Sequence, residues 1–219
     1  MIVAVTNSKG GVGKTTVAVH LAVWWHEQSA AVALVDADAQ GASSTWLTEA
    51  APAIPVFRLQ TPDEILDLVP ALKGDFAVVV IDGPAGLSEV TRAILLVSDL
   101  ALLPCGPSVL DLRAASEAIR VVKQAQRVRQ GSPQALLVPN KLQARYRLSR
   151  ELVETAKSLD IPATPGLRLR QAYADAAGQG DVVWRLGPRA QAAANEIKEL
   201  FHGQFGQRPQ NPQRSLAHR

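Results

Sequence analysis

Short apolar runs alternate with amphipathic stretches along most of the chain. Runs of Val, Ile, Leu and Ala are typical of buried strands, whereas apolar positions three and four apart are typical of helices. The predicted strands are residues 2–6, 31–35, 54–59, 76–81, 100–103 and 135–138. The predicted helices are residues 15–27, a segment that begins at Thr61, 111–129, 149–159 and 188–201. This alternation favours βαβ units, so we expect an α/β fold with a mostly parallel twisted sheet and helices on both faces.

The composition fits one folded domain followed by a short tail. Of 219 residues, 47% are hydrophobic and 20% are charged, which is enough to bury a sizeable core over residues 1–202. Residues 203–219 are basic and rich in Gln and Pro, and we expect them to be disordered. The single cysteine, Cys105, excludes a disulfide framework and a Cys-rich zinc site. No signal peptide or long apolar run is found, so we expect a soluble cytoplasmic protein.

Positive charge is concentrated in one part of the chain. The formal net charge is only +3, yet nine basic residues and a single acid, Glu117, lie between Arg113 and Arg150. Such a segment could form a face that binds an anionic polymer. It could equally consist of solvated helix faces, and charge alone leaves both interpretations open.

The most specific chemical signal is the segment SKGGVGKTT at residues 8–16, between the first predicted strand and the first predicted helix. A Gly-rich turn at a helix N-terminus forms an anion cradle, because its backbone N–H groups point inward and small residues let phosphates approach. In such a loop Lys14 reaches the β- and γ-phosphates, Thr15 ligates Mg²⁺ and Thr16 reaches the α-phosphate. A second lysine, Lys9, precedes the double glycine. The sequence therefore predicts a phosphate-binding loop with one unusual lysine.

Acidic residues end two of the predicted strands. Asp82 follows a buried run, where its carboxylate can hold a magnesium-bound water beside the loop, although an acid at this place can also be a helix cap. Asp36 and Asp38 end an earlier strand, where one can structure the site and the other can position an attacking water. Asp36 is also a candidate for the magnesium site. A turn that simply favours aspartate is the alternative for this pair.

Together these segments resemble the ParA/MinD family of ATPases. The segment KGGVGKTT at residues 9–16 is similar to the deviant Walker A motif of that family. The segment DADAQ at residues 36–40 resembles the family's Asp-x-Asp-Pro-Gln, with alanine in place of proline. The segment DGP at residues 82–84 resembles the Asp-Thr-Pro or Asp-Ser-Pro after the Walker B strand, with glycine in place of the hydroxyl residue. Two later segments also resemble the family, at residues 104–108 and 167–180.

The resemblance implies a P-loop NTPase fold and a switch built on ATP and Mg²⁺. Two ATP-bound monomers face each other, and Lys9 reaches the phosphates of the partner much as an arginine finger does. Asp38 orients the hydrolytic water, and Asn140 contacts the adenine. The implied catalytic residues are Lys9, Lys14 and Asp38. The implied nucleotide-binding residues are Lys9, Gly10, Gly11, Val12, Gly13, Lys14, Thr15, Thr16 and Asn140.

Features outside the ATP site distinguish among the activities known in the family. The tail lacks the apolar face of a membrane helix, and one cysteine per subunit cannot supply the thiolates of a bridged iron–sulfur cluster. The basic excess suits a ParA-type partition ATPase, which hydrolyses ATP slowly, is stimulated by a partner and binds duplex DNA without sequence preference. The residues expected at DNA are Arg145, Arg147, Arg150, Arg168, Arg170 and Lys198.

Such a protein dimerises on ATP at the nucleoid and segregates plasmid or chromosome DNA, or positions another cargo. Its partner is expected to be a small centromere-binding or cargo-adaptor protein, and no membrane contact is expected. The alternative is a metabolic P-loop enzyme of the same superfamily, such as an ATP-dependent amidoligase or a dethiobiotin-synthase-like ligase. Lys9 argues against that alternative.

Overall fold

A six-stranded parallel sheet forms the centre of the molecule. The computed structural model describes residues 1–143, 145, 147, 149, 151, 152 and 160–206. The strand order is β3-β2-β4-β1-β5-β6, and the five pairings between neighbours are parallel. The strands are β1 (Ile2–Asn7), β2 (Val32–Asp36), β3 (Val56–Arg58), β4 (Val78–Ala85), β5 (Leu100–Cys105) and β6 (Gln134–Pro139). The predicted α/β class and parallel sheet are confirmed.

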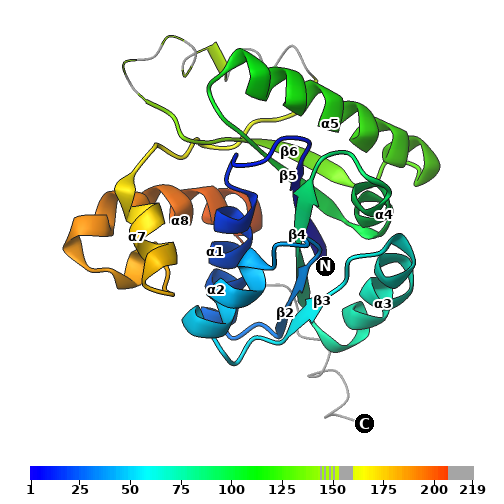
Figure 1. Cartoon of the computed structure of the whole chain (residues 1–219), viewed down its shortest axis with the longest axis horizontal. Helices are drawn as coiled ribbons and strands as arrows, with labels where there is room; N and C mark the ends of the chain where they lie inside the picture. The colour runs from blue at the N-terminus through cyan, green and yellow to red at the C-terminus, as the bar shows by residue number, and fades with distance from the viewer. Residues whose placement is uncertain (144, 146, 148, 150, 153–159, 207–219) are drawn as a thin grey trace.

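Helices cover both faces of this sheet (Figure 1). One layer contains α1 (Lys14–Glu27), α2 (Ala42–Ala50), α7 (Gln171–Gly178) and α8 (Gln191–Phe205), with the short 3₁₀ helices η1 (Val183–Arg185) and η2 (Pro188–Ala190). The other layer contains α3 (Pro62–Asp75), α4 (Glu89–Val97) and α5 (Val109–Val128). Because the strands are parallel, the loops after β1, β2, β4 and β6 meet at one edge of the sheet.

The observed helices differ from the predicted ones in three places and at the C-terminal end. The helices α2, α4 and α7 were not predicted. The last helix continues to Phe205, whose ring centroid lies 5.6 Å from that of Trp25, so the packed chain extends beyond the expected domain end at 202. Most of the predicted helix at 149–159 lies outside the described residues, as do residues 207–219 of the predicted tail.

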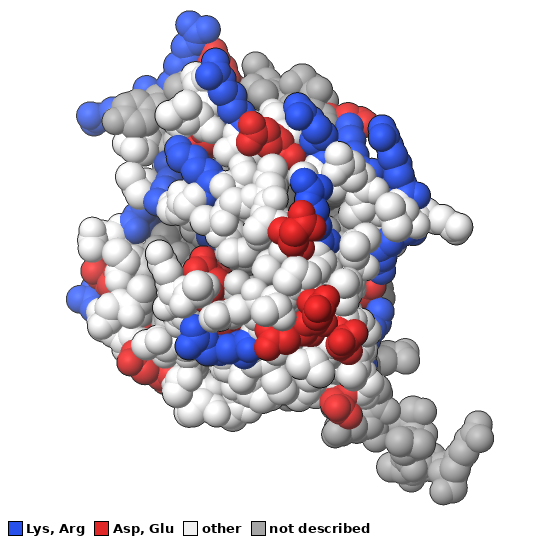
Figure 2. Space-filling model, turned by 45° about the vertical axis from the view of Figure 1, so that its right-hand side comes forward, with Lys and Arg blue, Asp and Glu red and all other residues white. Residues whose placement is uncertain are grey.

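The basic segment of the sequence forms an exposed face in its first half. Arg113, Arg120 and Arg127 lie on α5 and are exposed. Lys and Arg side chains gather at the height of α5, whereas Asp and Glu side chains gather below them at the height of α3 (Figure 2). The two charge signs therefore share one side of the molecule.

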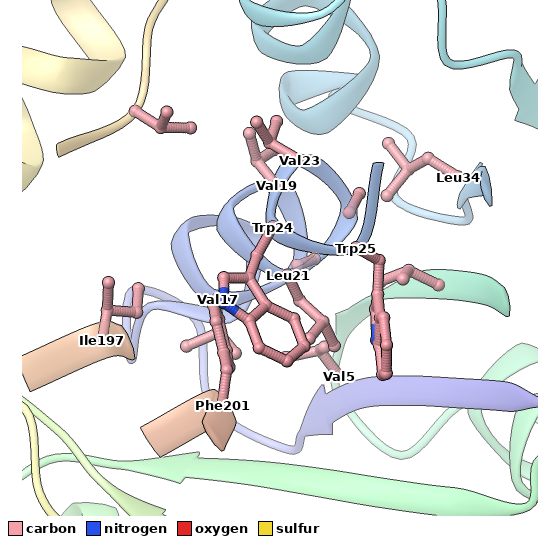
Figure 3. Packing of buried hydrophobic residues seen from close by; sticks show 14 of the residues in the cluster. Val5, Val17, Val19, Leu21, Val23, Trp24, Trp25, Leu34, Ile197 and Phe201 are labelled. Atoms are coloured by element: carbon pink, nitrogen blue, oxygen red, sulfur yellow. The ribbon is translucent and has the colours of Figure 1, made fainter. Parts of the chain in front are cut away.

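The helix α1 is the centre of the larger core. All nine residues from Val17 to Trp25 are buried, so the helix is enclosed on every side rather than amphipathic. Trp24 packs against Phe201 of α8 and against Trp25, so aromatic rings supplement an otherwise aliphatic core (Figure 3). Within the described part of the chain, no helix combines the length and apolar character needed to cross a bilayer.

One polar side chain, His20, is buried inside this core. Its Nδ1 lies 2.7 Å from the carbonyl oxygen of Thr16, and its Nε2 accepts a hydrogen bond of 3.2 Å from the backbone N–H of Val183. This pairing requires a neutral ring with the proton on Nδ1. The rings of Trp46 and Trp184 have centroids 5.5 Å from that of His20. Burial lowers the pKa of His20 to about 4. The side chain therefore joins α1 to η1 as a structural group.

This buried imidazole should make the protein less stable in mild acid. Because the pKa of His20 is about 4 when folded and about 6.5 when unfolded, the unfolded chain takes up a proton first as the pH falls. The free energy of unfolding should then fall by about 2–3 kcal/mol between pH 7 and about pH 4.5. Urea titrations of the wild type and of His20→Gln measure this loss. Equal pH dependence in the two proteins would contradict the assignment.

Candidate functional site

The predicted phosphate loop lines a pocket at the carboxyl edge of the sheet. Its cavity volume is about 390 Å³. The pocket is lined by Gly10, Gly11, Gly13, Lys14, Thr15, Thr16, Asp38, Gln40, Ala85 and Lys141. The structure thus brings the loop between β1 and α1 together with Asp38, which lies after β2, as the sequence interpretation requires.

Gly13 makes the tight turn into α1 possible. Its φ of 99° lies in the left-handed region that disfavours residues with a side chain. A Cβ atom here would also lie 2.2 Å from Nδ2 of Asn140. The glycine therefore lets the loop close tightly against the end of β6.

Lys14 is the buried cation of the pocket. It is 7% exposed, and its Nζ donates a hydrogen bond of 3.2 Å to the carbonyl oxygen of Lys9. Burial lowers the pKa of Lys14, while the carboxylates of Asp82 and Asp38 act in the opposite direction. An ammonium group held in this way gains strongly from an anionic ligand, because it lacks full hydration.

Thr15 and Asp82 form the place where a magnesium ion fits. The Thr15 hydroxyl donates a hydrogen bond of 2.8 Å to Oδ2 of Asp82. The other oxygen, Oδ1, is buried and has no hydrogen-bond partner among the described residues. Burial raises the pKa of Asp82 to about 7, which the hydrogen bond from Thr15 opposes. A buried acceptor without a donor is costly, so Thr15 and Asp82 fit a hydrated Mg²⁺, which these two residues would hold beside the phosphates.

The two carboxylates after β2 take different places. Asp36 is fully buried and accepts hydrogen bonds from the backbone N–H groups of Asp38 (3.1 Å) and Ser44 (2.9 Å) and from the Ser44 hydroxyl (2.5 Å). Asp36 thereby fixes the turn and the start of α2. Asp38 instead lines the pocket and is partly exposed. The Asp38 carboxylate also accepts a hydrogen bond of 3.0 Å from the backbone N–H of Gln40, so it contributes to the turn as well as to the pocket. The roles of Asp38 in hydrolysis and of Asp36 in metal binding stay predictions.

Two residues at the end of β6 hold the phosphate loop from the side. Asn140 donates a hydrogen bond of 2.7 Å from Nδ2 to the carbonyl oxygen of Val12. Lys141, at a left-handed φ of 56°, donates from Nζ to the carbonyl oxygen of Gly11 at 2.6 Å. The adenine contact of Asn140 stays a prediction. Lys141 was missed by the sequence interpretation, although a cation directly after a predicted site residue was a usable signal.

Lys9 points toward α5 rather than toward its own phosphate pocket. Its Nζ forms an ion pair of 2.6 Å with Asp111, and the Ser108 hydroxyl donates to the other oxygen of the same carboxylate at 2.5 Å. Burial would raise the pKa of Asp111, but the hydrogen bonds from Lys9 and Ser108 and the Lys9 charge hold it below its ordinary value. The two lysines of the loop therefore have different surroundings.

The basic residues expected at DNA do not form one free cluster. Arg168 and Arg170 share the carboxylate of Glu196, with N–O distances of 3.6 and 2.6 Å. Lys198 lies over the ring of Trp184, with its Nζ 5.8 Å from the centroid. Arg145 and Arg147 are exposed, and Arg147 pairs with Glu151 at 2.5 Å, whereas Arg150 lies outside the described residues. Their part in DNA binding stays a prediction.

A parallel α/β sheet with a Gly-rich loop, a buried lysine and a Thr–Asp pair at one edge defines a P-loop nucleotide-binding protein. The sequence matches the family described as the CobQ/CobB/MinD/ParA nucleotide binding domain over residues 3–183. The chain therefore belongs to this family, and the resemblance to ParA and MinD proteins is confirmed.

Relatives and solved structures extend this match over most of the chain. The chain is 35% identical over 208 residues to Maintenance of carboxysome distribution protein A of Halothiobacillus neapolitanus, covering 91% of this chain and 94% of that protein. An ATP complex of a Cyanothece McdA variant has a TM-score of 0.70 at 18% identity, covering 91% of this chain and 95% of that one. Cobyrinic acid a,c-diamide synthase of Mycobacterium smegmatis, solved with ADP and magnesium, has a TM-score of 0.68 at 21% identity, covering 96% and 98%.

Proposed function

We propose that this chain is a ParA-type ATPase that dimerises on ATP, binds duplex DNA without sequence preference and positions a cargo through a small adaptor protein. Hydrolysis of ATP to ADP and phosphate releases the dimer, and the protein works in the cytoplasm at the nucleoid. The name of the H. neapolitanus relative supports a large intracellular body as cargo, beside plasmid or chromosome DNA. Mg²⁺ is the metal that the Thr15–Asp82 pair would hold, and it would neutralise phosphate charge there.

The placement of Lys9 is the observation that carries this proposal. Lys14 lines the pocket of its own subunit, whereas the Lys9 side chain is 39% exposed, pairs with Asp111 and is not among the side chains that line this pocket. In an ATP-bound dimer, a cation next to the phosphate loop would stabilise the negative charge that develops on the phosphates of the facing subunit.

Replacing Lys9 should separate ATP binding from dimer-dependent hydrolysis. We expect Lys9→Ala to keep ATP affinity within about threefold of wild type and to lose about 100-fold or more in hydrolysis, because a transition-state cation is removed. Calorimetry, phosphate release and sedimentation with ATP measure the three properties. Lys73→Ala is the matched control, because Lys73 is also an exposed, ion-paired lysine. Wild-type hydrolysis by Lys9→Ala would rule out a shared site.

The DNA part is tested by anisotropy with a labelled random duplex in ATP, in ADP and without nucleotide. Binding is expected with ATP only, and each neutralised phosphate steepens the log–log salt dependence by about 0.9. Replacing Arg168 and Lys198 should flatten that slope for all sequences alike. If neither dimers nor DNA binding appear with ATP, the metabolic ligase becomes the better interpretation. Its fold is shared, as the M. smegmatis synthase illustrates, and fold alone does not choose between them.

A further inference from the structure

A row of arginines runs along the exposed side of α5. Arg113, Arg120 and Arg127 recur every seven residues, which places them on one side of the helix over about 21 Å. None of the three has an Asp or Glu oxygen within 4 Å among the residues that the structure describes. The one acid in the row is Glu117. We call this row the α5 basic stripe.

The exposed side of α3 carries the opposite charge. Asp63, Glu64 and Asp67 are exposed in its first half. Leu66 and Leu68 lie on either side of Asp67 in sequence and are 41% and 49% exposed. We call this surface the α3 acidic face. Exposed leucines beside acids provide apolar contact area as well as charge for a partner of matching character.

Between these two surfaces lies α4, which adds little net charge. Its exposed charges, Glu89 and Arg92, pair with each other at 3.6 Å, and Arg92 donates to Gln124 of α5 at 3.1 Å. On this side of the molecule the charge is therefore mostly negative at α3 and mostly positive at α5 (Figure 2), with exposed Arg58 beside Glu64 as an exception at the α3 end. A surface with this gradient is complementary to a copy of itself turned by half a rotation.

We propose that the α3–α4–α5 side of the protein is a contact surface for a second copy of this chain. A two-fold axis through α4 places the α3 acidic face of each copy against the α5 basic stripe of the other, so every charge contact is made twice. Both helices follow parallel strands and run in the same direction, and the two-fold axis that pairs them runs along α4 in the plane of the contact, so each helix meets its counterpart in parallel. Asp63 and Asp67 then approach the half of α5 that holds Arg113 and Arg120.

The same geometry supplies apolar contact and disfavours DNA as the occupant. Val109 and Leu110, at the start of α5, are 52% and 64% exposed and come near the partner's exposed leucines in this arrangement. A DNA duplex on this side would place phosphates against the acids of α3, which repel them. A second copy matches both halves of the surface, whereas DNA matches only one.

This contact is separate from the dimer of the proposed function. It uses the side of the sheet covered by α3, α4 and α5, whereas the ATP site lies at the carboxyl edge. Two different two-fold contacts on one protomer link more than two copies, as a closed tetramer or as an open chain according to how the two axes lie. That last consequence rests on the proposed function, but the contact itself requires no nucleotide.

The test is a charge-swap complementation without nucleotide, followed by sedimentation velocity. Variant A carries Arg113→Glu, Arg120→Glu and Arg127→Glu, and variant B carries Asp63→Lys and Asp67→Lys. We expect the wild type to self-associate at about 50 mM salt. At about 500 mM salt the association constant should be at least tenfold lower. Each variant alone should be monomeric, because its α3 and α5 surfaces then carry the same charge sign. An equimolar mixture should form an A–B heterodimer, because each surface of variant A faces a surface of opposite charge on variant B. Arg189→Glu, exposed on η2 in the other helix layer, is the control for charge reversal.

The outcomes separate this proposal from its alternatives. A monomeric wild type at low salt, persistent self-association of either variant, or a mixture that stays monomeric would each overturn it. If the wild type does not self-associate, and variant A but not variant B loses DNA binding in a separate assay with ATP, α5 would instead be a DNA-binding surface. The single pair Arg120→Glu and Asp67→Lys repeats the test with smaller changes if variant A does not fold. Because no nucleotide is present, failure here leaves the ATP-driven dimer of the proposed function unaffected.

Discussion

Lys14→Ala is expected to lower the affinity for Mg·ATP by about 100-fold to 1,000-fold. Lys14 is the buried ammonium of the pocket, and each charge-assisted hydrogen bond to a phosphate contributes about 1.5–3 kcal/mol. Two such bonds account for the expected loss. Calorimetric titration with a slowly hydrolysed ATP analogue measures the affinity directly, without interference from turnover.

Lys141→Ala is the comparison that makes this result specific. Lys141 lines the same pocket, but it is exposed and its Nζ donates to a loop carbonyl oxygen, so a smaller loss of about tenfold or less is expected. If both replacements reduced the affinity equally, positive charge near the loop would suffice. If Lys14→Ala bound ATP as the wild type does, the phosphate-loop assignment would be wrong.

Asp38→Ala is expected to slow ATP hydrolysis by about 100-fold or more while leaving ATP binding intact. Asp38 lines the pocket without belonging to the phosphate-binding loop. The substitution therefore removes a group that can orient water and leaves the loop unchanged. The ATP-bound dimer should then accumulate, because the step that releases it is blocked. Single-turnover phosphate release and size-exclusion chromatography with ATP measure the two effects.

The control for this prediction is Gln40→Ala, which removes another pocket side chain two residues away without removing a carboxylate. Its hydrolysis should stay within about tenfold of wild type. A monomeric Asp38→Ala protein with weak ATP binding would show that Asp38 shapes the turn, as Asp36 does.

The sequence allowed prediction of the strands and the loop because their signals are local. Buried strands of a parallel sheet are continuous apolar runs, and a Gly-rich turn of this spacing before a helix is typical of phosphate-binding loops. The helices α2 and α4 were missed because their sequences, ASSTWLTEA and EVTRAILLV, are rich in Ser, Thr and β-branched residues with weak helix propensity. Packing against the sheet stabilises these helices, and such packing is not visible in the sequence.

In the candidate site, too, contacts between distant parts of the chain could not be predicted from the sequence. The loop, Asp38 and Asp82 were predicted from strand ends, where side chains meet at one edge. The pairing of Lys9 with Asp111 joins residues 102 positions apart, and no local pattern indicates it. Glu196, which pairs with both Arg168 and Arg170, lies more than 25 positions away in α8. No local pattern showed that these two arginines share a carboxylate.

The enclosure of α1 determines where this protein can respond to a ligand. Its nine consecutive buried residues contact the sheet and the helices around it, and displacing them would expose apolar surface at about 25 cal/mol for each Å². The phosphates would thus bind beside a rigid helix, and movement is left to exposed segments near the site, such as the turn at Ala39 and Gln40 and the start of α5 at Val109 and Leu110. Amide hydrogen exchange would then be slow along α1 in every nucleotide state, whereas the exchange rates of those two segments would change with the bound nucleotide.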